Sequence, residues 1–280
     1  MEWMERFKRN IIVFKARFLI SMKIYFRYPV NFIMTLAEPI IWLTPFYFMG
    51  KSFSGGTNTI PGFAEYTGNS DYMGFLVIGY MISSYVNMVF WVMGFSLKEE
   101  MRQGVLESNW SAPVNRIILM ISKSLFQFCA TTFEIILTGI ICHFAFGFSI
   151  NSNIWEAIGF LIPGIIGMLG LGLMIGALVL LAKEANGIID ISSSLVTGLS
   201  GGYFPIKVMP KAFLFMSLVL PLTYVYDSSR NLLINQVTLM PLSQEFVILL
   251  ISMFGFIFLG SWVFNKVEKK CRTLGILGMH

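Results

Sequence analysis

Few side chains in this sequence have the type and spacing that catalysis or metal binding requires. A phosphate-binding loop needs Gly-x-x-x-x-Gly-Lys-Ser/Thr, because its first glycine permits the turn that aims backbone N–H groups at phosphate. The nearest match ends in Gly50-Lys51-Ser52, but Pro45 stands where the first glycine is required. His143 and His280 are the only histidines, which is too few for a zinc site built on histidine ligands. The sequence therefore predicts neither a nucleotide loop nor a zinc site.

Three carboxylates, Glu38, Glu134 and Asp190, lie inside apolar sequence and could form a general acid/base pair. Carboxylates at membrane depth more often bind neighbouring helices or line a pathway. We therefore treat four residues as candidates for lining a pathway: Asn87, Glu134, Asp190 and Ser193. Small polar side chains also serve as hydrogen-bond partners between helices, so this set has a purely structural interpretation as well.

The composition places these residues in a membrane. Hydrophobic residues make up 56% of the 280 residues and charged residues 12%, with a mean hydropathy of +0.72. A soluble domain does not have this balance. About 20 apolar residues cross a bilayer. The sequence predicts an all-α polytopic protein in which six regions qualify or nearly qualify as spans: Asn31–Phe48, Met73–Ser96, Ile117–Phe148, Trp155–Ala182, Gly187–Pro205 and Glu245–Asn265.

Basic residues are distributed unevenly between the two sides that these spans define. With both termini in the cytoplasm, only four of the 20 basic residues fall outside: Lys51, Lys207, Lys211 and Arg230. The positive-inside rule therefore predicts a multi-pass protein with cytoplasmic termini. The net charge of +5 is explained by this orientation and by contact with anionic lipid, so nucleic acid is not an expected partner. Asp227 and Arg230 are expected where the chain returns to the outer surface.

The first 28 residues have the pattern of an amphipathic helix. Large apolar residues recur at steps of three or four, from Trp3 to Tyr25, with basic residues largely between them. This period suits a helix that lies in the membrane interface. A helix that packs on another protein has the same pattern. Pro29 is expected to separate this segment from the first span.

One charged stretch lies between the second and third spans. It begins Lys98-Glu99-Glu100-Met101-Arg102 and continues through Gly104-Val105-Leu106-Glu107 to Pro113 and Arg116. Such charges are costly in lipid. We expect residues 97–112 to leave the bilayer, form a short surface helix and contact something other than lipid.

A second unusual segment, residues 200–226, is rich in glycine and proline within apolar sequence. Gly201, Gly202, Pro205, Pro210 and Pro221 cannot all belong to one straight helix. A broken backbone at membrane depth is tolerated only where protein buries it or where it lines a cavity. We expect one or two short re-entrant helices near the outer side; a surface loop with a short helix is the alternative.

Both segments resemble those of ABC-2 type (type V) ABC transporter permeases. Glu99-Glu100-Met101-Arg102-Gln103-Gly104-Val105-Leu106-Glu107, followed by Pro113 and Arg116, is similar to that family's E-x-x-R-x-G-T/V-L-E…P-x-x-R. The stretch from Ser200-Gly201-Gly202-Tyr203-Phe204-Pro205 through Met209-Pro210 to Pro221-Leu222-Thr223-Tyr224 is similar to S-G-x-x-F-P…L-P…P-L-T-Y. The resemblance covers essentially the whole chain as a single transmembrane domain, residues 1–280. Asn109-Trp110-Ser111 departs from the usual aliphatic run.

The resemblance implies a transporter subunit rather than an enzyme. Such permeases form homodimers or heterodimers in the plasma membrane, and each binds a separate ATPase that holds ATP and Mg²⁺, so no cofactor is expected here. The charged segment would be the coupling helix, seated on that ATPase through Glu99, Glu100, Arg102, Gly104, Val105, Leu106, Glu107, Pro113 and Arg116. The broken segment would form the outer gate, with Gly201, Gly202, Phe204, Pro205, Pro210, Pro221 and Tyr224. Family substrates include drugs, lipids and lipid-linked glycans, mostly exported.

Two other classes of function remain open from the residues alone. One is a membrane-embedded lipid-modifying enzyme that uses Glu134 or Asp190, and the other is an accessory membrane subunit without a transport path. An ATPase partner with phosphate-loop motifs would discriminate the transporter from both. The identity of the substrate does not follow from the sequence.

Overall fold

The computed structural model describes residues 2–27, 29–55, 60–104, 116–150 and 153–274. Within these ranges the chain forms helices and no strands, which confirms the all-α prediction. The elements are α1 (Glu2–Arg27), α2 (Pro29–Phe53), α3 (Pro61–Thr67), α4 (Tyr72–Arg102), α6 (Arg116–Phe146), α7 (Ile154–Ala182), α8 (Asn186–Leu199), the short 3-10 helix η1 (Ile206–Val208), α9 (Lys211–Val219), α10 (Pro221–Ile234) and α11 (Leu242–Thr273).

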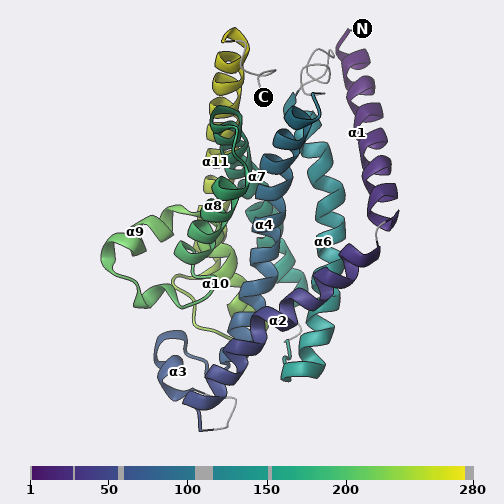
Figure 1. Cartoon of the computed structure of the whole chain (residues 1–280). Helices are drawn as coiled ribbons and strands as arrows, with labels where there is room; N and C mark the ends of the chain where they lie inside the picture. The colour runs from purple at the N-terminus through teal and green to yellow at the C-terminus, as the bar shows by residue number, and fades with distance from the viewer. Residues whose placement is uncertain (1, 28, 56–59, 105–115, 151–152, 275–280) are drawn as a thin grey trace.

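The helices α4, α6, α7 and α11 run side by side, α2 crosses them obliquely, and the molecule has two ends (Figure 1). We call the end where α1 begins and α11 finishes the terminal end, and the end that carries α3 the far end. Five helices within the described residues are long and apolar enough to cross a membrane, and they include most of α2, α4, α6, α7 and α11. A polytopic membrane protein is therefore confirmed.

α4 is the central helix. It packs against α6, α7, α8 and α10, and its residues from Met73 to Met101 are largely buried. Asp71 caps its first turn, since its side chain accepts a hydrogen bond from the backbone N–H of Gly74 at 2.8 Å. The two helices that flank α4 have further partners. α7 makes its most extensive contact with α11, and α6 packs against α1 and α2 as well as α4. Every functional segment described below contacts α4 or follows a helix that does.

The fifth predicted span, Gly187–Pro205, is not one continuous helix. Its helical part, α8, has 14 residues. At 1.5 Å per residue it is about 21 Å long, less than the ~30 Å thickness of the hydrocarbon core. The chain nevertheless passes from the terminal end to the far end in this region. After α8 it continues through α9 and α10, a pair of helices bent by 90°. The fifth crossing is therefore made in pieces.

The bend between α9 and α10 follows from Pro221. Leu220 precedes this proline and has extended backbone angles (φ −79°, ψ 129°), as expected for a residue whose helical conformation a following proline disfavours. Pro221 then occupies the first turn of α10, where its missing N–H has no helical partner in any case. Figure 1 shows α9 projecting sideways from the bundle. The predicted short helices are present in residues 200–226.

α1 is helical as predicted, but it runs along α6. The rings of Phe18 and Phe126 lie 5.5 Å apart, and the Tyr25 hydroxyl donates to Glu134 Oε1 at 2.6 Å. These two contacts are seven residues apart on α1 and eight on α6, so the two helices are parallel. The expected position, flat in the membrane interface, therefore differs from the observed one, because α6 offers the aromatic face of α1 an apolar surface within the same chain (Figure 1).

Candidate functional site

α10 places a row of polar side chains inside the protein. All residues from Pro221 to Arg230 are buried, and the helix packs against α4, α7 and α11. Polar groups in such a position need partners, because an unsatisfied buried group destabilises the fold. The contacts of α10 therefore reveal which parts of the chain it holds together.

Arg230 is the centre of these contacts. Its side chain is buried, with 3% of the residue exposed, and it donates to three backbone carbonyl oxygens. Nη1 donates to Gly201 O at 2.7 Å and Nη2 to Gly202 O at 2.8 Å. Nε and Nη2 both approach the carbonyl oxygen of Phe75 on α4, at 3.3 and 3.2 Å. One side chain thus connects α10, the turn after α8, and α4.

Aromatic rings complete the surroundings of this guanidinium group. Its carbon lies 3.3 Å from the centroid of the Phe75 ring and 5.2 Å from that of Tyr226. A ring face attracts a cation through its quadrupole, more strongly where water is excluded. Among the described residues no carboxylate forms a salt bridge with Arg230, so its direct contacts are carbonyl dipoles and ring faces.

Glycines allow the backbones to approach this closely. A Cβ atom at Gly79 of α4 would collide with the carbonyl oxygen of Gly202 and lie 2.8 Å from Arg230 Nη2. Gly201 has a φ of +82°, which side-chain-bearing residues rarely adopt. Backbone conformation at Gly201 and Gly202 therefore matters for a geometric reason: these glycines present their carbonyl oxygens to Arg230.

Tyr226 and Ser83 add a second link between α10 and α4. Their hydroxyl oxygens are 2.7 Å apart, and Ser83 also lies 2.7 Å from the carbonyl oxygen of Gly79. The predicted gate residue Tyr224 instead donates to Leu218 O at 2.6 Å. Tyr224 thus ties α10 back to α9 and fixes the bend between them.

The three prolines of the predicted gate each precede or begin a helical piece. Pro205 stands before η1, Pro210 stands before α9, and Pro221 begins α10. Phe204 is 41% exposed at the turn that follows α8. The prolines therefore set the path of the segment, while Phe204 presents an aromatic ring at its surface.

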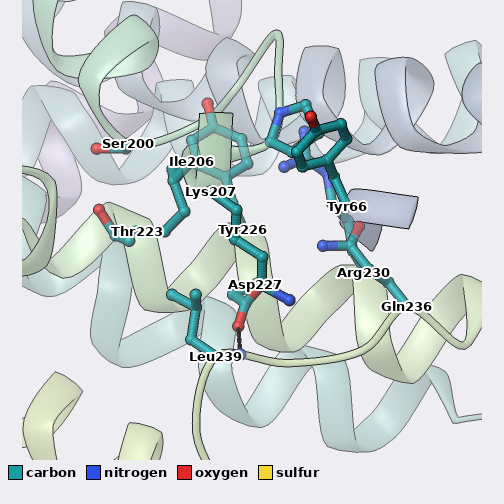
Figure 2. Close-up of a pocket in the computed structure, with 11 residues that line it drawn as sticks. Tyr66, Ser200, Ile206, Lys207, Thr223, Tyr226, Asp227, Arg230, Gln236 and Leu239 are labelled. Carbon is teal, nitrogen blue, oxygen red and sulfur yellow. Dashed lines mark hydrogen bonds between the residues drawn. The ribbon is translucent and has the colours of Figure 1, made fainter. Parts of the chain in front are cut away.

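Two buried carboxylates hold the chain where α10 passes into α11. Asp227 accepts a hydrogen bond from the backbone N–H of Leu239 at 2.6 Å (Figure 2). Glu245 accepts from the Ser228 hydroxyl at 2.6 Å and from the backbone N–H of Met240 at 3.3 Å. Asp227 and Arg230 were expected at the outer surface. That expectation is wrong, because both side chains find backbone partners inside the fold.

A small polar cavity of about 20 Å³ lies beside these residues, bordered by Asp227, Arg230 and the exposed Lys207 (Figure 2). Ser200 Oγ and Gln236 Oε1 are buried at this cavity without a hydrogen-bond partner among the described residues. Such a volume accommodates a single water molecule. The cavity is therefore part of the polar interior beside residues 200–226 and is too small for a transported molecule.

The charged segment begins as the last turns of α4. Arg102 binds Glu99 through two nitrogens, at 2.6 and 2.9 Å, and Gln103 donates to the same carboxylate at 2.7 Å. Gly104 follows with a φ of +66°, which ends the helix. Residues 97–102 therefore extend α4 rather than starting a separate helix. Val105, Leu106, Glu107 and Pro113 lie outside the described residues, and Arg116 begins α6.

An ion pair joins this end of α4 to the turn between α7 and α8. Lys98 Nζ lies 3.1 Å from Glu184 Oε2. The hydrogen bond from Lys98, with a further contribution from the backbone N–H of Gly187, holds the pKa of the Glu184 carboxyl below its ordinary value. α4 is thus connected at both ends to the segment that contains α8.

The four candidate pathway residues do not form one cluster. Glu134 lies on α6 and accepts the hydrogen bond from Tyr25 of α1. Asn87 is exposed on α4, Asp190 is exposed on α8, and Ser193 is buried on α8 with its hydroxyl 3.2 Å from the carbonyl oxygen of Asp190. Since α8 packs against α4 and α7 while Glu134 faces α1, the structure does not bring Glu134 and Asp190 together as an acid/base pair.

Sequence reasoning missed Arg230 as a functional residue. Tyr226 and Arg230 are four residues apart on a helix that begins at Pro221, and that spacing places two side chains on one face. This pattern was available in the sequence, but it does not say whether the face is buried.

One family model, described as ABC-2 type transporter, matches residues 13–234 of this chain. The matched region runs from α1 to the end of α10 and so includes both the charged end of α4 and the broken segment. No curated protein matches the sequence.

Proposed function

This chain belongs to the ABC-2 type transporter family, and we propose that it is the permease subunit of an exporter driven by a separate ATPase chain. Membership of the family makes it a membrane component of an ABC transporter. The ATPase partner, the direction of transport and the substrate are our proposals. The terminal end is cytoplasmic in this proposal, in agreement with the distribution of basic residues.

The observation that carries the proposal is the connection of α4 at both ends. Lys98 binds Glu184 at the terminal end, and Arg230 joins Phe75 to Gly201 and Gly202 toward the far end. Phe75 and Lys98 are 23 residues apart on one helix, or about 35 Å. A continuous helix of this length can transmit a displacement from one end to the other. Movement of the coupling segment would therefore reach the gate.

The end of α4 is suited to docking on a protein. Arg102, Gln103 and Gly104 are exposed there, and a charged rim of this kind steers a partner and fixes its orientation. We propose that residues 97–112 seat on the ATPase, with Val105 and Leu106 as the apolar anchor. Glu99, Glu100, Glu107, Pro113 and Arg116 complete the contact in this proposal.

The exposed faces of α4 and α8 support a dimer. Asn87, Trp91 and Phe95 are exposed at helical spacing on α4, and Ile191 and Leu195 are more than half exposed on α8. We propose that these faces meet a second permease subunit, either an identical chain or a related one, and that the pathway runs between the two copies. Asn87, Asp190 and Ser193 would then lie beside it, whereas Glu134 would stabilise α1. The cargo would be a drug, a lipid or a lipid-linked glycan.

The test is ATP hydrolysis by the complex in a plasma-membrane-like bilayer. The chain should co-purify with an ATPase, and reconstitution with the permease should stimulate hydrolysis. Glu100→Lys, Arg102→Glu and Gly104→Leu should each abolish the stimulation without loss of the folded permease. Lys211→Glu, a charge reversal at the exposed first residue of α9, is the control and should keep it. Wild-type stimulation in all three variants would refute the docking proposal, and a chain that binds no ATPase would favour an enzyme or an accessory subunit.

A further inference from the structure

α6 and α7 leave an open groove between them. Each of the two helices packs along α4, but they have little contact with each other. In the half toward the far end, a cavity of about 770 Å³ is bounded by α4, α6, α7 and α10. Its walls are largely aliphatic, as Ile78, Met81, Ile136, Ile140 and Ile158 illustrate.

A second cavity continues the groove toward the terminal end. It has a volume of about 280 Å³ and is lined by residues of three of these four helices, α4, α6 and α7, including Met88, Phe128 and Ile162. The linings of the two cavities adjoin on each helix: Tyr85 precedes Met88 by one turn on α4, and Leu161 precedes Ile162 on α7. The two cavities therefore form one apolar groove.

The length of the groove matches the hydrocarbon layer. On α6 its lining extends from Ile121 to Phe144, which is about 35 Å along a helix. The hydrocarbon core of a bilayer is ~30 Å thick. An apolar groove of this length spans the depth at which lipid chains lie.

Polar groups border the far mouth of the groove. His143 and Ser149 belong to its lining. The ring nitrogen Nδ1 of His143 is 2.6 Å from the carbonyl oxygen of Phe148, which can only accept, so Nδ1 donates and Nε2 remains as the nitrogen able to contact a headgroup. Trp155, beside the lining residue Ile154, is 83% exposed. Exposed tryptophan is typical of the membrane–water interface.

We propose that this groove is a binding site for phospholipid, with one acyl chain of a lipid from the far-end leaflet in the larger cavity and its headgroup at His143 and Ser149. The polarity of the site, polar at the mouth and apolar along its length, is that of such a lipid. Lipid tails are as apolar as the groove, so the hydrophobic effect does not favour an acyl chain in the groove over one in the surrounding bilayer. The preference comes from van der Waals contact on three sides instead of one, together with the polar contacts at the mouth.

An acyl chain in the larger cavity would contact α10. Ser229 and Leu233 of α10 belong to the wall of the larger cavity, and Ser229 immediately precedes Arg230. This contact distinguishes the groove from ordinary lipid-facing surface such as the side of α11, where Ile251, Phe254 and Phe258 are 66 to 71% exposed. The proposal concerns a lipid of the surrounding bilayer and holds whatever molecule the transporter carries.

Photochemical labelling tests the site. The full chain, with any subunits that co-purify, is reconstituted in vesicles of phosphatidylcholine and phosphatidylglycerol that contain a phosphatidylcholine with a diazirine in its acyl chain. Adducts are mapped by mass spectrometry after illumination. We expect adducts at Ile136, Ile140 and Ile158 to exceed those on the exposed face of α11 about tenfold, which corresponds to a preference of about 1.4 kcal/mol over bulk lipid.

A pair of glycine substitutions provides the matched comparison. A side chain at Gly139 projects into the groove and meets only the flexible end of Met81, whereas Gly159 of α7 has no neighbour within 4 Å of an added Cβ and does not line the groove. Gly139→Leu should reduce groove adducts to the level of the α11 face, and Gly159→Leu should leave them unchanged. Equal wild-type labelling of groove and α11 face would overturn the proposal, as would protein adducts at the groove in place of lipid. If Gly139→Leu fails to fold, the adduct map of the wild-type protein still decides the question. Labelling requires no ATPase activity, so a negative labelling result leaves the transporter proposal standing.

Discussion

Replacing Arg230 by methionine should unlock the turn between α8 and α9. Methionine keeps the length and apolar stem of the side chain but removes every donor, so Gly201 O and Gly202 O lose their partner. The Phe75 carbonyl lies inside α4 and keeps its helical hydrogen bond. Each unsatisfied buried group costs about 1–3 kcal/mol, so the closed turn should be destabilised by about 2–6 kcal/mol. Removing the buried charge offsets part of this loss.

Local opening of this turn can be measured through a buried neighbour. Ser200 is 1% exposed, so a cysteine at this position reacts with a water-soluble thiol reagent only when the turn opens. The background carries serine in place of the exposed Cys129. A loss of about 2 kcal/mol should accelerate the reaction roughly 30-fold, since 1.4 kcal/mol corresponds to a factor of ten. The permease remains inserted and is compared at equal membrane expression.

Two companion variants make the result specific to the hydrogen-bond geometry. Lys211→Met also replaces a basic residue with methionine, but at an exposed position on the same segment, and it should leave the rate unchanged. Arg230→Lys keeps the charge and loses the planar fork, so its rate should lie between those of wild type and Arg230→Met. An unchanged rate in Arg230→Met, with the protein folded, would refute the idea that Arg230 holds this turn closed.

The other predictions concern the segment, the topology and the ion pair. Gly202→Val and Pro205→Leu should impair export more than Lys207→Ala or Lys211→Ala, because a Cβ at Gly202 lies 2.6 Å from the Thr197 side chain and 3.0 Å from the Tyr226 hydroxyl; equal transport by all four, normalised to expression, would contradict this. A cysteine at Asn153 should react with an impermeant thiol reagent from outside intact cells and one at Ser108 should not, and the reverse would overturn the orientation. Lys98→Glu should weaken ATPase stimulation, and the double variant Lys98→Glu with Glu184→Lys should restore part of it. Equal loss in the single and the double variant would show that this ion pair does not connect α4 to the turn before α8 in function. Because Lys98 lowers the pKa of Glu184, the contribution of this pair should be complete above the ordinary pKa of a glutamate, near 4.3, and be lost as the pH falls through the lower folded value, as a pH titration of the unfolding midpoint can verify.

The sequence by itself determined the membrane class, the position of five spans, and the places where the chain breaks. These are local properties: about 20 apolar residues form a spanning helix wherever they occur, and Pro205, Pro210 and Pro221 redirect the backbone through their own covalent geometry. The family resemblance depended on the same local segments, and the family match confirms it. What these segments contact was not available from the sequence.

Only the tertiary structure decided the position of α1, the length of α8 and the burial of Arg230. The amphipathic pattern of α1 fits a lipid interface and a protein surface equally well, and contact with Phe126 and Glu134 made the choice. A charged residue near a proline-rich segment is ordinarily expected at the surface, since burying it alone is costly. Arg230 is buried because Gly79, Gly201 and Gly202 let three carbonyl oxygens and an aromatic ring converge on it from segments 28 to 155 residues away. No local pattern can encode such a convergence.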